Sequence, residues 1–360
     1  MRNILKYTFL AINLLLVICL GLGMLCTKIS PEKSAFLPYF GLLFPFFALL
    51  NFFFFLFWIY FKKWFCLISL CMLLFAVPYI KDIFPLSIST PHISEKDKKI
   101  SILSYNIAMF GEARNFDAIF SFIKEKNPDI VCLQEFGFYK SSKDLDRNVV
   151  FKKFSKMYPY KHVWYKNQFK SKDYGVVTFS KYPIINKQKI LYDSKYNISI
   201  YSDIVVDSDT IRIFNNHLES VKFTVKEKSE VNHLNSEEFL TQETFQLTES
   251  LLRKLGSAFK IRAKQADAVA LEIKRSPYKT IVCGDFNDMP ISYTYKKIKG
   301  NMNDLFVSTA FGFDYTYHDM AMFLRIDHIF ISSAFLPIQC EIFHTNYSDH
   351  DPIFGEFLLK

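Results

Sequence analysis

Acidic and amide side chains in this sequence directly follow short apolar runs of the kind found in buried strands. The clearest case is TIVCGDFND, residues 280–288, where a strand-like run leads into Asp285, Asn287 and Asp288. Successive side chains of an extended strand point to opposite faces, so Asp285 and Asn287 are expected to share one face. A carboxylate at the end of a core strand is costly to bury unless it is paired or binds a cation. The motif therefore indicates a functional site.

The same pattern occurs at five further places along the chain. The motifs end at or contain Asn106 in SYN, Glu135 in CLQE, His217 in FNNH, Asp327 in RIDH, and Asp349 and His350 in SDHD. Together they supply carboxylate and amide oxygens, which hard divalent cations such as Mg²⁺ prefer, and water can complete the coordination. A zinc site would favour more nitrogen or sulfur ligands at fixed spacing, and the sequence has no C-x-x-C pair. Histidines beside such an acidic cluster suit chemistry on phosphate esters.

In chain order, these motifs resemble a known family signature. SYNI, DIVCLQE, NNHLES, CGDFND, RIDHIF and SDHDP are similar to the ordered motifs of the endonuclease/exonuclease/phosphatase superfamily, also called DNase-I-like. The resemblance covers about residues 100–360. It implies a four-layer α/β sandwich, in which two mixed β-sheets pack face to face and helices flank them. It also implies hydrolysis of phosphoester bonds with Mg²⁺ or Mn²⁺ as the cofactor.

The resemblance further implies which residues hold the metal and activate the water. Glu135 would be the principal metal ligand, with Asn106 and Asp349 in the same coordination shell. Asp285 would orient or deprotonate the attacking water, and Asn287 would hold that water or a phosphate oxygen. These roles agree with the chemistry, because the attacking water needs a base that the metal does not bind tightly.

The histidines complete the implied site. His350 would contact the scissile phosphate, and Asp327 would accept its other ring hydrogen and fix the tautomer. His217 would be a second phosphate contact or the proton donor to the leaving oxygen. A metal and an imidazolium offset the negative charge that gathers on the phosphoryl oxygens during attack.

Ordinary structural interpretations exist for the same residues. Asn106 is of a type common at strand exits, Asp285 and Asn287 could form an Asx turn, and His217 could be a core histidine. Asp327 could pair with Arg325, two residues earlier. For the whole protein, the alternative to an enzyme is a membrane binding or scaffold protein that retains the fold without activity. The complete set of motifs favours the enzyme, because a decayed enzyme should lose some catalytic positions.

Three apolar runs in the first eighty-odd residues predict a membrane region. They cover residues 4–26, 35–61 and 64–80. A helix of about 20 residues crosses the roughly 30 Å hydrocarbon layer, so the first two are long enough and the third just reaches. A cleaved signal peptide has one short apolar core, so three runs indicate retained helices. We therefore expect three transmembrane helices in residues 1–84, a linker over 85–99 and the catalytic domain over 100–360.

Charge bears on both the substrate and the membrane orientation. Of the net charge of +9, residues 1–90 carry +5, so the rest carries only +4 and is not a strongly basic nucleic-acid surface. If Arg2, Lys6, Lys62 and Lys63 are cytoplasmic, three spans place the catalytic domain outside the cytoplasm. We expect an integral protein of a bacterial inner membrane that acts on a lipid, small-molecule or nucleic-acid phosphoester. No protein partner is predicted.

Overall fold

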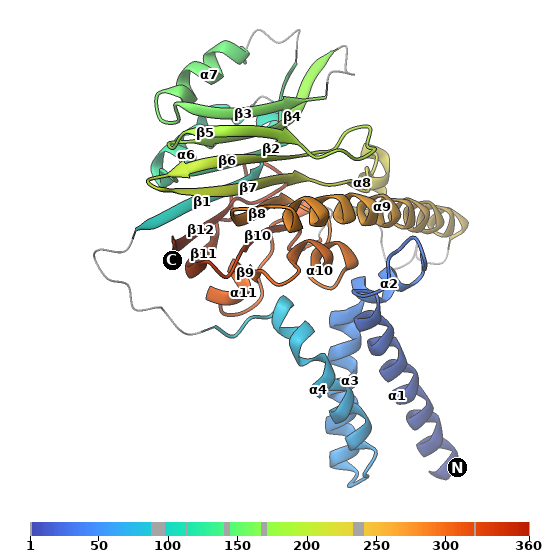
Figure 1. The fold of residues 1–360 in the computed structure, drawn as a ribbon. Helices are drawn as coiled ribbons and strands as arrows, with labels where there is room; N and C mark the ends of the chain where they lie inside the picture. Colours follow the sequence, from blue (N-terminus) through green and yellow to red (C-terminus); the bar gives the residue numbers. More distant parts are fainter. Residues whose placement is uncertain are drawn as a thin grey trace.

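The protein consists of an α/β unit and a bundle of apolar helices that projects from it (Figure 1). The computed structural model describes residues 2–87, 98–112, 114–139, 145–166, 171–232, 241–319 and 322–359. Most of the expected linker, residues 88–97, lies outside the described residues. The bundle is formed by residues of the expected membrane region, and the α/β unit by residues of the expected catalytic domain.

Within the described residues, the strands form two mixed sheets. The first has the order β11 (Phe335–Ile342), β12 (Ile353–Leu359), β1 (Lys99–Asn106), β2 (Ile130–Tyr139), β4 (Lys172–Ser180) and β3 (Tyr160–Tyr165). The second has the order β5 (Ile184–Lys189), β6 (Ile198–Val206), β7 (Asp209–His217), β8 (Lys279–Asp285), β10 (Asp327–Ile331) and β9 (Asn303–Asp304). The pairs β1–β2 and β7–β8 are parallel, and the neighbouring pairs are antiparallel. Each sheet therefore has a parallel pair beside hairpin-type partners.

Helices cover the outer face of each sheet, so the unit has four layers. The first sheet is covered by α6 (Phe116–Lys126) and α7 (Arg147–Ser155), and the second by α9 (Gln242–Lys274) and α10 (Tyr293–Lys299). In α6, Phe116, Ile119 and Ile123 are buried at the spacing of one helix face, which is why this segment packs as an amphipathic helix. A third apolar core lies between the sheets and includes Ile102, Ile213 and Ile281. The predicted four-layer α/β sandwich is confirmed.

Shorter helices connect these layers. They are α5 (Ala108–Glu112), which follows β1, α8 (Val225–Asn232), which follows β7, and α11 (Leu305–Thr309), which follows β9. The side chain of Asp304 accepts a hydrogen bond from the backbone N–H of Val307 at 3.3 Å and so caps α11.

The bundle contains α1 (Arg2–Leu25), α2 (Leu37–Leu42), α3 (Phe44–Tyr60) and α4 (Cys66–Ile83). Within the described residues, α1 and α4 are long and apolar enough to cross a membrane. Helix α3 is apolar but has 17 residues, so it spans only about 26 Å at 1.5 Å per residue. The structure thus gives two candidate spans and a shorter third helix, where the sequence predicts three.

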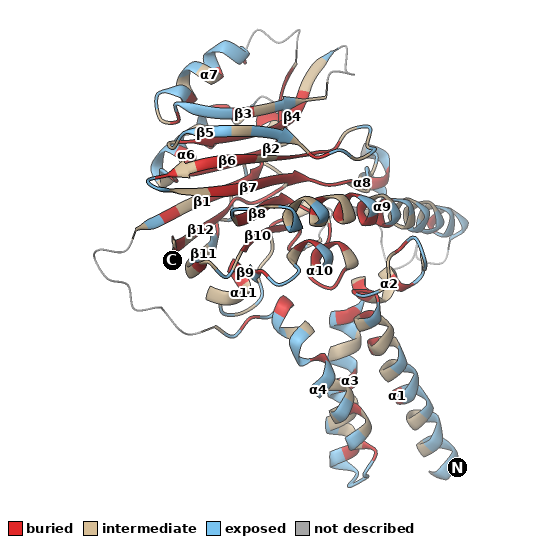
Figure 2. Ribbon diagram, in the orientation of Figure 1, coloured by how far each residue is buried: buried red, intermediate tan, exposed pale blue. Residues whose placement is uncertain are grey.

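The bundle has apolar side chains outside and polar side chains inside. Figure 2 shows exposed outer faces on α1, α3 and α4, and these faces carry large apolar side chains such as Leu15, Phe53 and Phe75. In contrast, Asn13 and Asn51 are fully buried. Asn13 donates to Ser69 at 2.8 Å and accepts from Trp58 at 3.0 Å, which ties α1 to α4 and α3.

Direct contacts join the bundle to the α/β unit. Asp82, near the end of α4, forms an ion pair with Lys296, and its backbone carbonyl accepts a hydrogen bond from Arg325 at 2.7 Å. Tyr39 of α2 donates to the carbonyl of Leu252 on α9 at 2.7 Å. Since Arg325 and Asp82 are both buried, these contacts place the bundle firmly against the unit that carries the acidic motifs.

Candidate active site

Three of the strand-end motifs meet at one end of the neighbouring strands β7, β8 and β10 of the second sheet. His217 ends β7, Asp285 ends β8 and Asp327 begins β10. In the strand register, His217 lies opposite Asp285 and Asp285 lies opposite Asp327, so the three residues form a row across three neighbouring strands. Gly284 allows this row to form. A Cβ at Gly284 would lie 2.0 Å from the Asn216 carbonyl oxygen, and its φ of +128° is one that glycine tolerates.

Asp285 is held by two amide side chains. Its Oδ2 accepts hydrogen bonds from Asn106 Nδ2 at 2.9 Å and Asn287 Nδ2 at 3.0 Å, and its Oδ1 accepts from the Asn287 backbone N–H at 2.8 Å. The last bond closes an Asx turn, with Asn287 at φ +53°. The Asx turn expected from the structural interpretation is present, and it is compatible with a role of Asp285 in the site. Burial raises the pKa of Asp285 to about 6, and the charge of Asp327 acts in the same direction.

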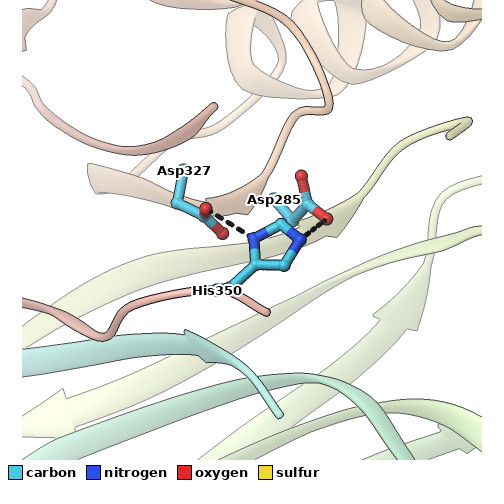
Figure 3. Close-up of side chains that lie close together, drawn as sticks. All are labelled: Asp285, Asp327 and His350. Atoms are coloured by element: carbon cyan, nitrogen blue, oxygen red, sulfur yellow. Dashed lines mark hydrogen bonds and ion pairs between the residues drawn. The ribbon is translucent and has the colours of Figure 1, made fainter. Parts of the chain in front are cut away.

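His350 lies between two carboxylates (Figure 3). Its Nδ1 is 2.9 Å from Asp327 Oδ2 and its Nε2 is 3.7 Å from Asp285 Oδ2. Burial disfavours the charged ring, but Asp327 and Asp285 outweigh it, so the pKa of His350 lies well above its ordinary value. Arg325 pairs with Asp304 at 2.8 Å. The pairing of Asp327 with His350, one of the two interpretations of RIDH, is the one found.

Glu135 is turned out of its sheet by a β-bulge. The pairing of β2 with β4 shifts between Leu133 and Phe136, and Glu135 has a φ of +50°. The bulge changes which residues face the helices: Val131 and Leu133 do so before it, and Phe136 and Phe138 after it. The sequence places Glu135 at a strand end, but β2 continues to Tyr139. Glu135 reaches the site because the strand bends there.

Glu135 has neighbours from both sheets. His217 Nε2 lies 3.6 Å from Glu135 Oε1, and Asn106 Nδ2 lies 3.4 Å from the same oxygen. The Tyr174 side chain is hydrogen-bonded to Glu135. Burial and then the charge of Asp349 raise the pKa of Glu135. Tyr174 is a site residue that the sequence analysis missed, since a lone tyrosine in a strand carries no chemical signature.

His217 occupies the centre of the cluster. Its Nε2 is buried, has no hydrogen-bond partner among the described residues, and lies 3.8 Å from Asp285 Oδ2. Burial lowers the pKa of His217, although Asp285 opposes this. The ring therefore offers an unsatisfied nitrogen beside two carboxylates.

A divalent cation fits the donors around Glu135. Glu135 and Asp349 line one cavity, and their mutual repulsion is what a bound cation would relieve. A second group, Asp285, Asp327 and His350, has possible ligand atoms within 4.8 Å of one another. Its nearest atoms already form hydrogen bonds with one another and with the amides, so the Glu135 side is the better site.

The predicted site residues thus lie in one place, with one difference in orientation. The shared cavity has a volume of about 340 Å³, and its polar lining includes Glu135, Asp285, Asn287, Asp349 and His350. Asn106 turns its amide nitrogen toward the carboxylates, while its oxygen accepts from the Ala108 backbone N–H at 3.1 Å. This placement suits a residue that orients Asp285. The direct coordination expected for Asn106 stays a prediction.

Solved structures share the fold at low sequence identity. An endonuclease/exonuclease/phosphatase family protein from Leptotrichia buccalis matches with a TM-score of 0.51 and 16% identity, over 71% of this chain and 98% of its own. An endonuclease/exonuclease/phosphatase from Beutenbergia cavernae matches with a TM-score of 0.51 and 13% identity, over 73% of this chain and 72% of its own. Among curated proteins there is no match.

Family models match both parts of the chain. Residues 6–83 match a domain of unknown function (DUF8431). Residues 103–350, well over half of the chain, match the model described as the endonuclease/exonuclease/phosphatase family. That segment contains the eight predicted site residues, from Asn106 to His350, and Tyr174. The chain is therefore a member of the endonuclease/exonuclease/phosphatase family.

Proposed function

We propose that this protein is a membrane-anchored phosphoesterase that depends on Mg²⁺ or Mn²⁺. It would hydrolyse a phosphodiester or phosphomonoester by attack of a water that Asp285 activates. The observation that carries this proposal is the meeting of Glu135, Asp285, Asp349 and His350 in one cavity, from positions up to 215 residues apart in the sequence. Family membership makes phosphoester hydrolysis the expected chemistry.

In this mechanism Asp285 is the general base. A pKa of about 6 leaves it ionised at neutral pH yet able to take a proton from water, which is the range in which a base is most effective. Asn106 and Asn287 orient it by their hydrogen bonds. Glu135 and Asp349 would hold the cation, which when bound supplies Lewis-acid stabilisation of the phosphoryl charge.

The two histidines would contact the phosphate. His350 has its Nδ1 fixed by Asp327, so its Nε2 is the atom that can donate to a phosphoryl oxygen. His217 Nε2, which lacks a hydrogen-bond partner among the described residues, lies 3.6 Å from Glu135 and 3.8 Å from Asp285, and both of these residues line the cavity. Both rings would stabilise charge that develops during attack. Besides stabilising this charge, His217 would protonate the leaving oxygen.

Membrane anchoring is supported by the arrangement of the bundle. A soluble protein rarely exposes such continuous apolar faces, whereas membrane helices turn their polar residues inward, as Asn13 and Asn51 do here. The amino terminus and the α3–α4 turn, with Lys62 and Lys63, lie at the end far from the α/β unit (Figure 1). By the positive-inside rule, the catalytic unit would lie outside the cytoplasm of a bacterial inner membrane.

Anchoring can be tested by fractionation. The full chain should stay in the membrane pellet after extraction at alkaline pH, and its mass should include residues 1–84. Release into the supernatant, or a mature chain that lacks α1, would contradict the proposed anchor.

Enzymatic activity can be tested on a generic substrate. The full chain, purified in detergent, should hydrolyse bis-p-nitrophenyl phosphate with Mg²⁺ or Mn²⁺ and stop when EDTA is added. Glu135→Gln should abolish turnover, while the exposed Glu341→Gln on β11 is the matched control and should not change it. Folded protein without turnover on this ester, plasmid DNA or phospholipid would favour the alternative, an inactive membrane scaffold.

A further inference from the structure

The cavity at the site has both charged and apolar lining residues. The charged ones include the catalytic carboxylates and His350, and also Lys222, Lys228, Arg262 and Asp288. The apolar ones come from four parts of the chain: Leu42; Leu255 and Phe259; Met289; and Met322, Leu324 and Ile326. A small soluble phosphoester would leave these apolar side chains in contact with water, so the lining needs another explanation.

One of the apolar lining residues comes from the helical bundle. Leu42 ends α2, which connects the long helices α1 and α3 at the end of the bundle that meets the α/β unit. Tyr39 of the same short helix contacts the Phe259 ring edge-on, at a centroid separation of 5.7 Å. The apolar lining of the cavity therefore includes a residue of the proposed membrane region, where that region meets the catalytic unit.

A second cavity meets the first at the catalytic edge. It has a volume of about 350 Å³ and shares Glu135, Ser220 and Lys222 with the first cavity. Its other lining residues are polar or carry polar tips: Lys172, Tyr174, Tyr196 and Asn197. A phosphate held at Glu135 would therefore lie where the first cavity, with its apolar side chains, meets this polar second cavity.

We propose that the substrate is an amphiphilic phosphodiester of the membrane lipid class. This inference rests on the proposed phosphoesterase function. The hydrocarbon part occupies the cavity of Leu42 and Leu255, the phosphate lies at the carboxylates, and the polar headgroup enters the cavity of Lys222. Hydrolysis forms a bond from the water oxygen to phosphorus and breaks one P–O ester bond. The leaving oxygen departs as an alcohol with a proton, and a phosphomonoester remains.

The test compares two esters with the same chromophore, methyl p-nitrophenyl phosphate and dodecyl p-nitrophenyl phosphate. The full chain is held in amphipol and supplied with Mg²⁺ or Mn²⁺. Each buried methylene strengthens binding about fourfold, so three to four of them should raise kcat/KM for the dodecyl ester about 10²-fold over the methyl ester. The double variant Leu42→Ser with Leu255→Ser should reduce that preference below about tenfold, through a loss of kcat/KM for the dodecyl ester.

Neighbouring residues give a matched control. Leu43 and Leu252 lie on the same two segments and are exposed, and they do not line the cavity. Leu43→Ser with Leu252→Ser should keep the wild-type preference for the dodecyl ester. Partition of this ester into amphipol is the same for both double variants, so it cannot account for a difference between them. Equal rates for the two esters, or a preference that survives Leu42→Ser with Leu255→Ser, would overturn the lipid assignment while leaving the phosphoesterase proposal in place.

A binding measurement separates failure of the inference from failure of the proposed function. Calorimetry in EDTA would compare dodecylphosphonate with methylphosphonate. If neither ester is hydrolysed, the phosphoesterase proposal fails. In that case, dodecylphosphonate binding that the cavity double variant weakens at least tenfold still supports an amphiphile cavity. Binding that is absent, or equal in both double variants, overturns it.

Discussion

Replacing Asp285 with Asn should separate activity from stability. The proposed base is lost, so kcat should fall by about 10²- to 10⁴-fold, the range that general-base catalysis contributes. The effect on folding is expected to be small, because the wild-type carboxylate is itself unfavourable where it is buried.

The magnitude follows from the pKa and the hydrogen bonds. The pKa of Asp285 is about 6 against an ordinary 3.8, so at 1.36 kcal/mol per unit its charge lowers the free energy of unfolding by about 3 kcal/mol at neutral pH. The sign follows because the unfolded state loses its proton first, so this loss of stability grows as pH rises from about 4 to 6. An Asn at this position has no charge, but its NH₂ group would face the NH₂ group of Asn106 or Asn287. Two donors without an acceptor between them cost about 1–3 kcal/mol. The two effects nearly offset.

The assay is turnover of bis-p-nitrophenyl phosphate together with the thermal midpoint in EDTA, where no cation contributes. The midpoint of Asp285→Asn should stay within a few degrees of wild type or rise. Asp288→Asn is the matched control, because Asp288 pairs at 3.2 Å with the buried Arg262. Breaking that pair should lower the free energy of unfolding by about 3–5 kcal/mol with a smaller loss of rate. Turnover above a tenth of wild type in Asp285→Asn would refute the general-base role.

Three further predictions concern other parts of the structure. Asp327→Asn should slow turnover about 10- to 100-fold, because His350 loses a charged partner at 2.9 Å. In a double-mutant cycle with His350→Asn, the two losses of activity should be non-additive. Additive losses would contradict the pairing. Burial lowers the pKa of His162 to about 4 from 6.5, so its contribution to stability is complete above about pH 6.5 and falls as pH drops toward 4. Thermal midpoints at pH 7.5 and 5 should show that His162→Asn removes about 2 kcal/mol of this acid sensitivity, and equal sensitivity in both proteins would exclude His162 as its source. Asn13→Leu should destabilise the bundle in detergent by about 1 kcal/mol through loss of its two interhelical hydrogen bonds, and an unchanged melting midpoint would count against a packed polar core.

Much of the fold was predictable because local pattern and tertiary structure agree. Apolar runs before Asn106, His217 and Asp285 end where β1, β7 and β8 end. The buried face of α6 follows the spacing of its apolar residues from Phe116 to Ile123. In these segments the side-chain period alone decides which residues face the core.

The orientation of Glu135 was not predictable in the same way. Its strand continues for four residues beyond it, and a bulge shifts the side-chain period so that Leu133 and Phe136 face the same layer. In CLQEF, the apolar residues Leu133 and Phe136 are three apart instead of two, which is the sign of the bulge. In a single sequence, however, the same spacing is also expected where a strand ends. The positive φ at Glu135 is maintained by the surrounding sheet.

Other features depend on contacts between distant segments. Tyr174 enters the site because β4 pairs with β2 beyond the bulge. The edge strands β3 and β11 are partly exposed and mix charged with apolar residues, so they lack a strong period. The apolar lining of the cavity combines Leu42 with Ile326, which come from distant parts of the sequence and are brought together by docking of the bundle.

The central claim is that these scattered carboxylates converge on one divalent cation. Its most direct test is Mn²⁺ binding to the full chain, followed by electron paramagnetic resonance with Mg²⁺ as competitor. Wild type should bind Mn²⁺ at one site that Mg²⁺ displaces, Glu135→Gln should weaken binding at least tenfold, and Asp327→Asn should bind as wild type does. Unchanged binding in Glu135→Gln, or a loss confined to Asp327→Asn, would contradict the account.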